Sequence, residues 1–149
     1  MKAAIGNTLL LGIIVTFMST VLLVVVSSIV YTKAYRIKNR IIDEIEKVET
    51  FDDSVTATLT TLFGEIGYKT NPNMNNSVCD KYARKIADTR HPEVVNKTSA
   101  YSYCVIKVDA DSSRGGYYYK VVSFAYLDLP LVSAIQVPVY GETRIFYNS

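Results

Sequence analysis

The feature that most constrains this chain is an uncharged stretch from Ala3 to Thr32, near its amino terminus. Within it, residues 9–31 form a continuous run composed mostly of Leu, Ile and Val. As a helix rising 1.5 Å per residue, this run would be about 34 Å long, enough to cross a hydrocarbon core of about 30 Å. A cleaved secretory peptide has a shorter apolar core followed by a small-residue cleavage site. We therefore expect a permanent transmembrane helix, with membrane lipid as its first partner.

The helix is expected to continue beyond the membrane as an amphipathic stalk. Apolar residues recur at helical spacing along one stripe, at Ile37, Ile41, Ile45 and Val48. Asp43 and Lys47 stand four residues apart, a spacing that favours an ion pair. One helix over about residues 7–49 would divide the chain into an anchor with its stalk, residues 1–49, and a globular domain, residues 50–149. The apolar stripe then needs a partner, for which that domain is the simplest candidate.

Two short helices are expected at the start of the domain. A break at residues 50–54 offers Asp52 or Asp53 as the cap of a new helix. Its apolar positions repeat at helical spacing, and Gly64 and Gly67 are expected to end it; these positions are Val55, Leu59, Leu62, Phe63 and Ile66. A second short helix is predicted from Ser77 and is expected to end at His91 and Pro92.

From Ala100 the pattern changes to a period of two, with many β-branched and aromatic residues. This predicts a three-stranded antiparallel sheet over residues 101–109, 117–127 and 136–147. A brief connection, with room for one helical turn, is predicted over residues 128–135. Pro138 indicates that the third strand lies at an edge, and Gly141 indicates a bulge or a turn. The predicted fold class is α+β.

Cys79 and Cys104 are the only two cysteines, and with a single histidine they are too few for a structural zinc site. A disulfide, two separate buried thiols and a reactive cysteine are the alternatives, and we favour the disulfide. It would contribute about 3 kcal/mol by restricting the unfolded chain. It would also imply a domain outside the cytoplasm, because disulfides persist in oxidising compartments.

The charges around the helix point to the opposite orientation. Basic residues follow the apolar run at Lys33, Arg36, Lys38 and Arg40, whereas only Lys2 precedes it. The positive-inside rule, applied alone, would place the domain in the cytoplasm. We expect a single-pass protein of the cell membrane with an extracytoplasmic C-terminal domain, and protease access on intact cells would test this orientation.

The rest of the composition excludes several classes of function. The formal net charge is +2, which argues against a protein built to grip nucleic acid. His91 and Glu93 match the front half of a zinc deaminase signature, but the cysteine half is absent. Asp109 and Asp111 begin a calcium-loop pattern that lacks the required glycine and glutamate. We expect no catalytic residues, no metal and no cofactor, and hence no enzyme.

Two other features leave a structural and a functional interpretation open. Asn75 and Asn96 each begin a glycosylation sequon, which we interpret as chance matches. Tyrosine is abundant, and strand alternation places Tyr117 and Tyr119 on one face of the sheet and Tyr118 on the other. Cross-strand packing explains tyrosines in such positions, and a binding surface is the alternative.

Two parts of the chain carry a family resemblance. The first runs from Gly6 to Leu11, into the apolar helix and on to residues 38–42; the second comprises residues 121–126, 129–131 and 137–144. On these stretches the chain resembles the type IV pilin-like proteins, in particular the TadE/TadF-type pseudopilins, or minor pilins, of bacterial tight-adherence pilus systems. The resemblance implies a pilin-like fold in which a strand, a proline-containing connection and a terminal strand close the domain.

The resemblance also implies processing and assembly. Such pilins are cut after a glycine, here Gly6, and carry glutamate at the fifth mature position. Leu11 stands at that position in this chain, so cleavage and filament entry stay open.

The leading hypothesis is a pilin-like structural subunit that assembles through its N-terminal helix with other pilin-like subunits or pilus assembly proteins. Small residues that let helices approach closely are its physical basis; they are Gly12, Ser19, Thr20, Ser27 and Ser28. The alternative is a single-pass, membrane-tethered extracellular domain with a binding or regulatory role.

Overall fold

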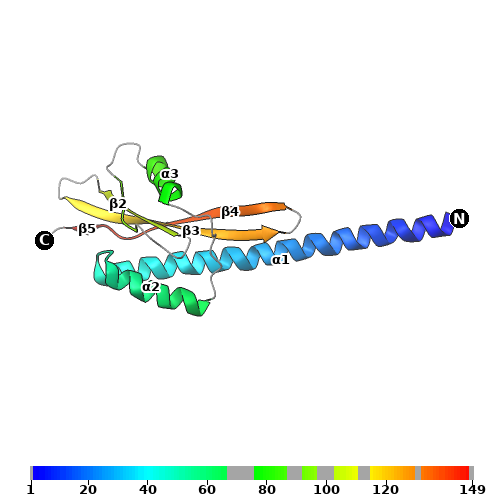
Figure 1. The fold of residues 1–149 in the computed structure, drawn as a ribbon, viewed down its shortest axis with the longest axis horizontal. Coiled ribbons are helices and arrows are strands. Elements are labelled where there is room, and N and C mark those ends of the chain that lie inside the picture. Colours follow the sequence, from blue (N-terminus) through cyan, green and yellow to red (C-terminus); the bar gives the residue numbers. More distant parts are fainter. Residues whose placement is uncertain are drawn as a thin grey trace.

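The computed structural model describes residues 2–66, 76–86, 92–96, 103–110, 115–129 and 132–147. Its helices are α1 (Lys2–Val48), α2 (Asp53–Ile66) and α3 (Asn76–Ile86). Its strands are β1 (Glu93–Val94), β2 (Tyr103–Asp109), β3 (Gly116–Leu129), β4 (Val132–Glu142) and β5 (Phe146–Tyr147). The predicted α+β class is confirmed, and the N-terminal half of α1 projects as a single helix away from the rest of the chain (Figure 1).

The sheet is antiparallel, but it has more strands than the three predicted. Its order is β1-β2-β3-β4, and β5 also pairs with the start of β3. The extra strands β1 and β5 have two residues each, so they are too short for a period-two pattern to reveal them. The long strand β3 is central, because its residues 117–123 pair with β2 and its residues 120–129 pair with β4.

The connection predicted over residues 128–135 is wrong at both ends. β3 continues to Leu129 and β4 begins at Val132, and these two residues pair across the hairpin. The register shifts between Leu127 and Leu129, where the sequence had indicated only the end of a strand. Residues 130 and 131 lie outside the described residues. The predicted edge position of Pro138 is confirmed, since β4 pairs with β3 alone among the described strands.

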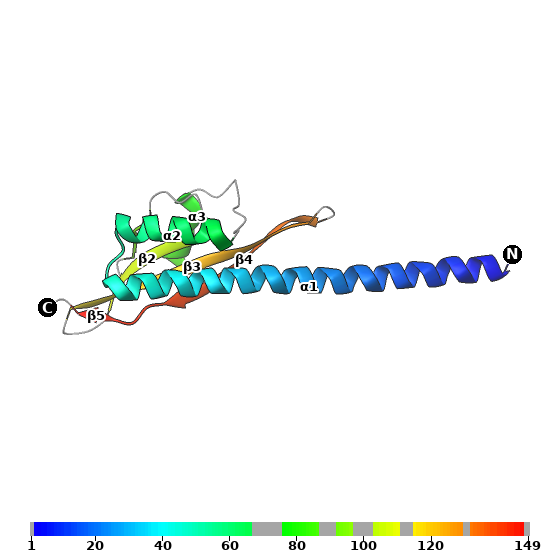
Figure 2. The ribbon, with the colours of Figure 1, turned by 90° about the horizontal axis from the view of Figure 1, so that it is seen from below.

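The sheet separates two layers of helix, which Figures 1 and 2 show from two directions. One face packs against α1 and α2, and its buried residues include Tyr103, Val105, Tyr119, Val121 and Phe146. The opposite face packs against α3, through Cys104, Ile106, Val108, Val122 and Phe124. Consecutive residues of β2 and β3 therefore enter different cores, as the pleat of a strand requires.

The predicted stalk stripe is confirmed over most of its length. Ile37, Ile41 and Ile45 are fully buried against the sheet and α2. Val48 does not belong to the stripe, because it is 48% exposed at the last position of α1. The next residue, Glu49, has a φ of 59°, an uncommon value for a residue other than glycine, and the helix ends there.

The local details of the helix ends partly differ from expectation. α1 begins at Lys2 rather than at residue 7. Lys47 pairs with Glu44, three residues earlier, at 2.6 Å between Nζ and Oε1, and not with Asp43 as predicted. Both spacings bring side chains together on a helix surface, so sequence spacing alone does not choose between them.

The cap of α2 is Asp52, the first of the two candidates. Its Oδ1 atom accepts hydrogen bonds from the backbone N–H groups of Ser54 and Val55, each 3.0 Å long. This satisfies donors that have no partner in the first turn of a helix. Gly64 does not end α2, which runs through it to Ile66, and Gly67 lies outside the described residues.

Gly141 forms neither a bulge nor a turn. It lies within β4 and pairs with Val121 in regular register. A Cβ atom added there would lie 2.5 Å from Cδ of Lys38 and 2.7 Å from Cδ1 of Ile42. The glycine therefore serves the close approach of β4 to α1, a tertiary reason that a local pattern does not contain.

Candidate functional site

The candidate assembly surface lies on the exposed half of α1. At about 100° per residue, Gly12, Thr16, Ser19, Thr20 and Ser27 fall within an arc of about 100°, and we call them the small-residue stripe. Part of it forms a shallow groove lined by Leu9, Gly12, Ile13, Thr16, Phe17 and Thr20. Small side chains on one helix face let another helix approach closely.

The structure brings together four of the five residues predicted for helix assembly, with Thr16 as an addition. Ser28 lies about 100° from Ser27 around the helix axis, outside the small-residue stripe. Thr16 was missed, although its spacing of four from both Gly12 and Thr20 was visible in the sequence. The proposed processing residue, Gly6, lies within α1, and a Cβ atom there would meet no atom within 4 Å.

The hydroxyl groups of the small-residue stripe are already satisfied within α1. Thr16 donates to the carbonyl oxygen of Gly12 at 2.9 Å, and Thr20 donates to that of Thr16 at 2.9 Å. Ser19 and Ser27 donate in the same way to carbonyl oxygens four residues earlier, at 2.8 and 2.7 Å. The stripe therefore needs no polar partner, so either lipid or an apolar helix face can cover it.

The small-residue stripe continues directly into the face of α1 that packs against the sheet. Val30 and Ala34 stand at the same angular position and pack with Ala125 of β3 and Val139 of β4. The carbonyl oxygen of Ala34 also accepts a hydrogen bond from the Ser123 hydroxyl at 2.8 Å. One face of α1 is thus covered by the chain's own sheet in its second half and exposed in its first half.

The exposed half of α1 also has the composition of a membrane span. The helix segment from Gly6 to Val48 contains an 18-residue window with a mean hydropathy of 2.8, and none of that window is buried within the chain. Large apolar side chains such as Leu11, Phe17 and Leu22 are all more than half exposed. A buried core helix would cover them, so the exposed window is typical of a segment that lies in lipid.

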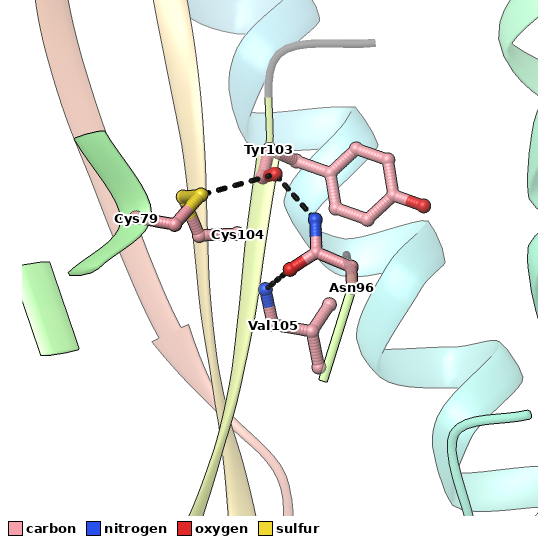
Figure 3. Close-up of a disulfide and its surroundings, with 5 residues drawn as sticks. All are labelled: Cys79, Asn96, Tyr103, Cys104 and Val105. Carbon is pink, nitrogen blue, oxygen red and sulfur yellow. Dashed lines mark hydrogen bonds between the residues drawn. A yellow bond between two sulfur atoms is a disulfide. The ribbon is translucent and has the colours of Figure 1, made fainter. Parts of the chain in front are cut away.

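Cys79 and Cys104 form the predicted disulfide. Their Cα atoms are 5.5 Å apart, and the bond joins α3 to β2 (Figure 3). Both cysteines are buried, and they pack with Val122 and Phe124 of β3. The other contacts that hold α3 on the sheet are side-chain packing, in which the Tyr82 ring lies 5.4 Å from that of Phe124 in β3 and 6.1 Å from that of Tyr140 in β4. The disulfide is therefore the covalent attachment of this outer helix.

Asn96 is a buried residue whose role the sequence did not reveal. Its side-chain amide donates to the carbonyl oxygen of Tyr103 at 2.7 Å, and its Oδ1 accepts from the N–H of Val105 at 2.7 Å (Figure 3). The side chain thus continues the pairing of β1 with β2 for one more position. Because both polar groups are used and the residue is buried, Asn96 is not an accessible acceptor for a glycan in this fold.

The three adjacent tyrosines divide between the two faces as predicted. Tyr117 and Tyr119 lie edge to face, 5.8 Å between ring centres, on the side of α1, whereas Tyr118 packs on the side of α3. Tyr119 is buried, so it cannot contact a partner while the domain is folded. The hydroxyl of Tyr117 donates to the carbonyl oxygen of Glu49 at 3.1 Å. All three therefore contribute to packing within the domain.

The described residues include no group of three or more His, Cys, Asp or Glu side chains able to hold a metal ion. A shallow polar cleft between α1 and α2 is lined by Arg36, Asn39, Arg40, Asp43 and Ile66. Partial burial raises the pKa of Tyr82, with a smaller contribution from Tyr140, so this phenol stays protonated at neutral pH.

Comparisons of this chain with protein-family models, with curated proteins and with solved structures found no match. The functional argument therefore rests on the residues and the geometry described above.

Proposed function

We propose that this protein is a pilin-like structural subunit, a minor pseudopilin of a type IV or tight-adherence-like pilus or secretion filament. It crosses the cell membrane once through α1 and holds residues 50–149 outside the cytoplasm. The observation that carries the proposal is the single continuous face of α1, half of which packs on the chain's own sheet while the other half is exposed.

Anchoring alone does not call for this arrangement. A helix that only faces lipid gains from large apolar side chains at every position, because each buried CH₂ group contributes about 0.8 kcal/mol. The residues of the small-residue stripe have fewer CH₂ groups, so this face of α1 gains less free energy from contact with lipid. In a membrane, small residues favour the association of two helices because they let the backbones approach closely. The hydroxyls of Thr16 and Thr20 are already hydrogen-bonded within α1, so the partner helix need not be polar. A second helix of the same kind fits these requirements.

The disulfide supports the proposed orientation. Cys79 and Cys104 are both buried and bonded, and a structural disulfide persists where the environment is oxidising. Protease added to intact cells should then remove the domain. If the domain is cleaved only after lysis, the orientation is reversed, and the basic residues after the span, such as Lys33 and Arg36, would explain it.

The sharpest test of assembly replaces Gly12 with leucine. A Cβ atom at Gly12 meets no other atom within 4 Å, so the longer side chain fits the isolated subunit. Val25→Phe is the matched control, because it also adds four carbon atoms but stands on the opposite face of α1. Both variants should reach the membrane at wild-type levels, and recovery of partner subunits by crosslinking or co-purification should fall for Gly12→Leu alone.

Ser27→Leu provides a second position on the same face, next to the sheet. Its side chain is half-buried, so its folding must be checked before its assembly is compared. Normal recovery of partners with both Gly12→Leu and Ser27→Leu would contradict the assembly role. A membrane-tethered extracellular binding or regulatory domain, in which α1 is only an anchor, would then be the better account.

A further inference from the structure

Lys38 of α1 is a lysine with an enclosed side chain and an accessible charge. Only 9% of the residue is exposed. The side chain passes β4 closely, since a Cβ atom at Gly141 would lie 2.5 Å from its Cδ and 3.1 Å from its Cε. Its Nζ stands 4.3 Å from the centre of the Tyr35 ring, and Tyr35 is 47% exposed. The ammonium group therefore lies at the outer edge of the contact between α1 and β4.

The acidic residues of the stalk do not pair with Lys38. Three of them are held by other groups: Glu44 by Lys47, and Glu46 and Glu49 by Arg144. The fourth, Asp43, stands about 140° from Lys38 around the helix axis. The part of α1 that carries this lysine therefore gives it no counter-charge.

The neighbouring strand gives it none either. Glu142 follows Gly141 in β4, so its side chain points to the opposite face of the sheet, where its Oε2 lies 3.9 Å from Nζ of Lys120. A buried charge is normally paired, because desolvation penalises an ammonium that has lost its water. Lys38 has lost most of its contact with water and has gained an aromatic ring, which attracts a cation less strongly than a carboxylate does. No described residue supplies the counter-charge, so we look for it in another molecule.

Lys38 lies on a continuation of the small-residue stripe. It stands 18 residues after Thr20, which is about five helical turns, or about 27 Å along the same side of α1. Ser27 and Tyr31 lie within about 20° of the line that joins them. Tyr31 and Tyr35 are 50% and 47% exposed, so this edge of α1 is open beside the sheet. A helix that packs along this edge of the stripe therefore meets the Lys38 ammonium further along.

We propose that a carboxylate side chain of the assembly partner binds the Lys38 ammonium, next to the Tyr35 ring. The positive charge selects an acidic group, and the enclosed side chain holds that charge at one level of α1. The ion pair then determines which partner fits and how far along the helix it packs. This inference rests on the proposed assembly through the small-residue stripe, and it adds the charge that the partner carries beyond the stripe.

A water-soluble carbodiimide tests this contact, because it joins an amine to a carboxylate only where the two groups touch. Native membranes that hold the full-length protein with its partners are treated, and the linked peptides are identified by mass spectrometry. We expect an amide bond between Lys38 and an acidic side chain of another polypeptide. Lys47 and Glu44, 2.6 Å apart in the same helix, are the internal positive control. Linkage of this control pair without any linkage at Lys38 would contradict the proposal.

Substitutions then separate recognition from mere proximity. Lys38→Met removes the charge and keeps most of the side chain beside Gly141, so the domain should still fold. This variant, and replacement of the linked partner acid by its amide, should each lower partner recovery about tenfold. Lys33→Met is the matched control, because it removes the same charge from an exposed position about 140° away on α1. Equal partner recovery for wild type and a folded Lys38→Met would overturn the proposal.

The stripe variants distinguish failure of this ion pair from failure of assembly. If Gly12→Leu loses its partners while Lys38→Met keeps them, the stripe is the assembly surface and the proposed ion pair is wrong. If Gly12→Leu, Ser27→Leu and Lys38→Met all keep their partners, the proposed assembly fails and the ion pair fails with it.

A lipid phosphate is the other anion that the Lys38 ammonium could meet. The purified full-length protein is placed in phosphatidylcholine nanodiscs with or without phosphatidylglycerol, and acetylation of Lys38 by a water-soluble active ester is followed by mass spectrometry. With no partner present, Lys38 should react equally in both. Protection by phosphatidylglycerol alone would assign the lysine to lipid and overturn the proposal.

Discussion

Ser123 of β3 donates its hydroxyl hydrogen to the carbonyl oxygen of Ala34 in α1, across 2.8 Å and 89 positions of sequence. Both residues are fully buried. The bond lies where β3 packs against α1, next to the contact of Ala34 with Ala125 and Val139. It therefore helps to fix the sheet to the stalk part of α1.

Replacing Ser123 with alanine should lower stability modestly. The lost hydrogen bond contributes about 1 kcal/mol, and the carbonyl oxygen of Ala34 keeps its position in the helix ladder. Ser123→Val should cost more, about 1–3 kcal/mol, because added bulk is forced against a fully buried Ala34. Denaturant unfolding in micelles, followed by near-ultraviolet circular dichroism, measures both. A valine variant as stable as wild type would contradict the close packing at this point.

Reduction of the Cys79–Cys104 disulfide should destabilise the domain by about 3 kcal/mol, on the chain-entropy estimate for a loop of this length. The double variant Cys79→Ala with Cys104→Ala should show a similar loss, and a reducing agent should then have no further effect on it. Unfolding midpoints with and without reductant give the comparison. If wild type unfolds identically under both conditions, the bond does not support the fold as we expect.

Asp52 should make the stability of α2 depend on pH. Hydrogen bonds from the Ser54 hydroxyl, and from the N–H groups of Val55 and Ser54, lower the pKa of this carboxyl below its ordinary 3.8. Because the folded pKa is the lower one, the stabilisation is full above about pH 4 and is lost as the pH falls through the folded value. Asp52→Ala should therefore lower the melting temperature at pH 7 and differ less from wild type at pH 2–3.

Asp53→Asn is the control for this titration, because the neighbouring carboxyl is not the cap. Its melting temperature should follow that of wild type through the same pH range. Asp52→Asn keeps an oxygen acceptor without the charge, so it should fall between wild type and Asp52→Ala at neutral pH. Equal pH profiles for wild type and Asp52→Ala would exclude the capping role.

Gly141 should tolerate alanine poorly, and the defect should depend on Lys38. The added Cβ would meet Cδ of Lys38 at 2.5 Å, so the lysine side chain or the strand must move. We expect a loss of about 1–3 kcal/mol for Gly141→Ala. Truncation by Lys38→Ala removes the clashing atom, so the double variant should recover part of this loss. A double-mutant cycle with unfolding free energies measures the coupling, and purely additive effects would contradict the contact.

Several features of this protein follow from the sequence alone because they depend on residues close together in the chain. The uncharged apolar run determines a helix long and apolar enough to span a membrane, and the stripe at Ile37, Ile41 and Ile45 determines which face of the stalk is buried. Strand alternation assigns Tyr117 and Tyr119 to one face. The sequence only favours a disulfide over separate thiols, because it is the packing of α3 on β2 that brings the Cα atoms of Cys79 and Cys104 to 5.5 Å.

Only the tertiary structure decides how distant segments meet. The two-residue strands β1 and β5 exist because longer strands offer them backbone partners, and Asn96 completes the pairing beside one of them. Gly141 is required by the closeness of Lys38, which stands more than 100 positions away in the sequence. Each of these contacts joins residues that are far apart in the sequence or depends on a strand elsewhere in the chain, so no local pattern contains it.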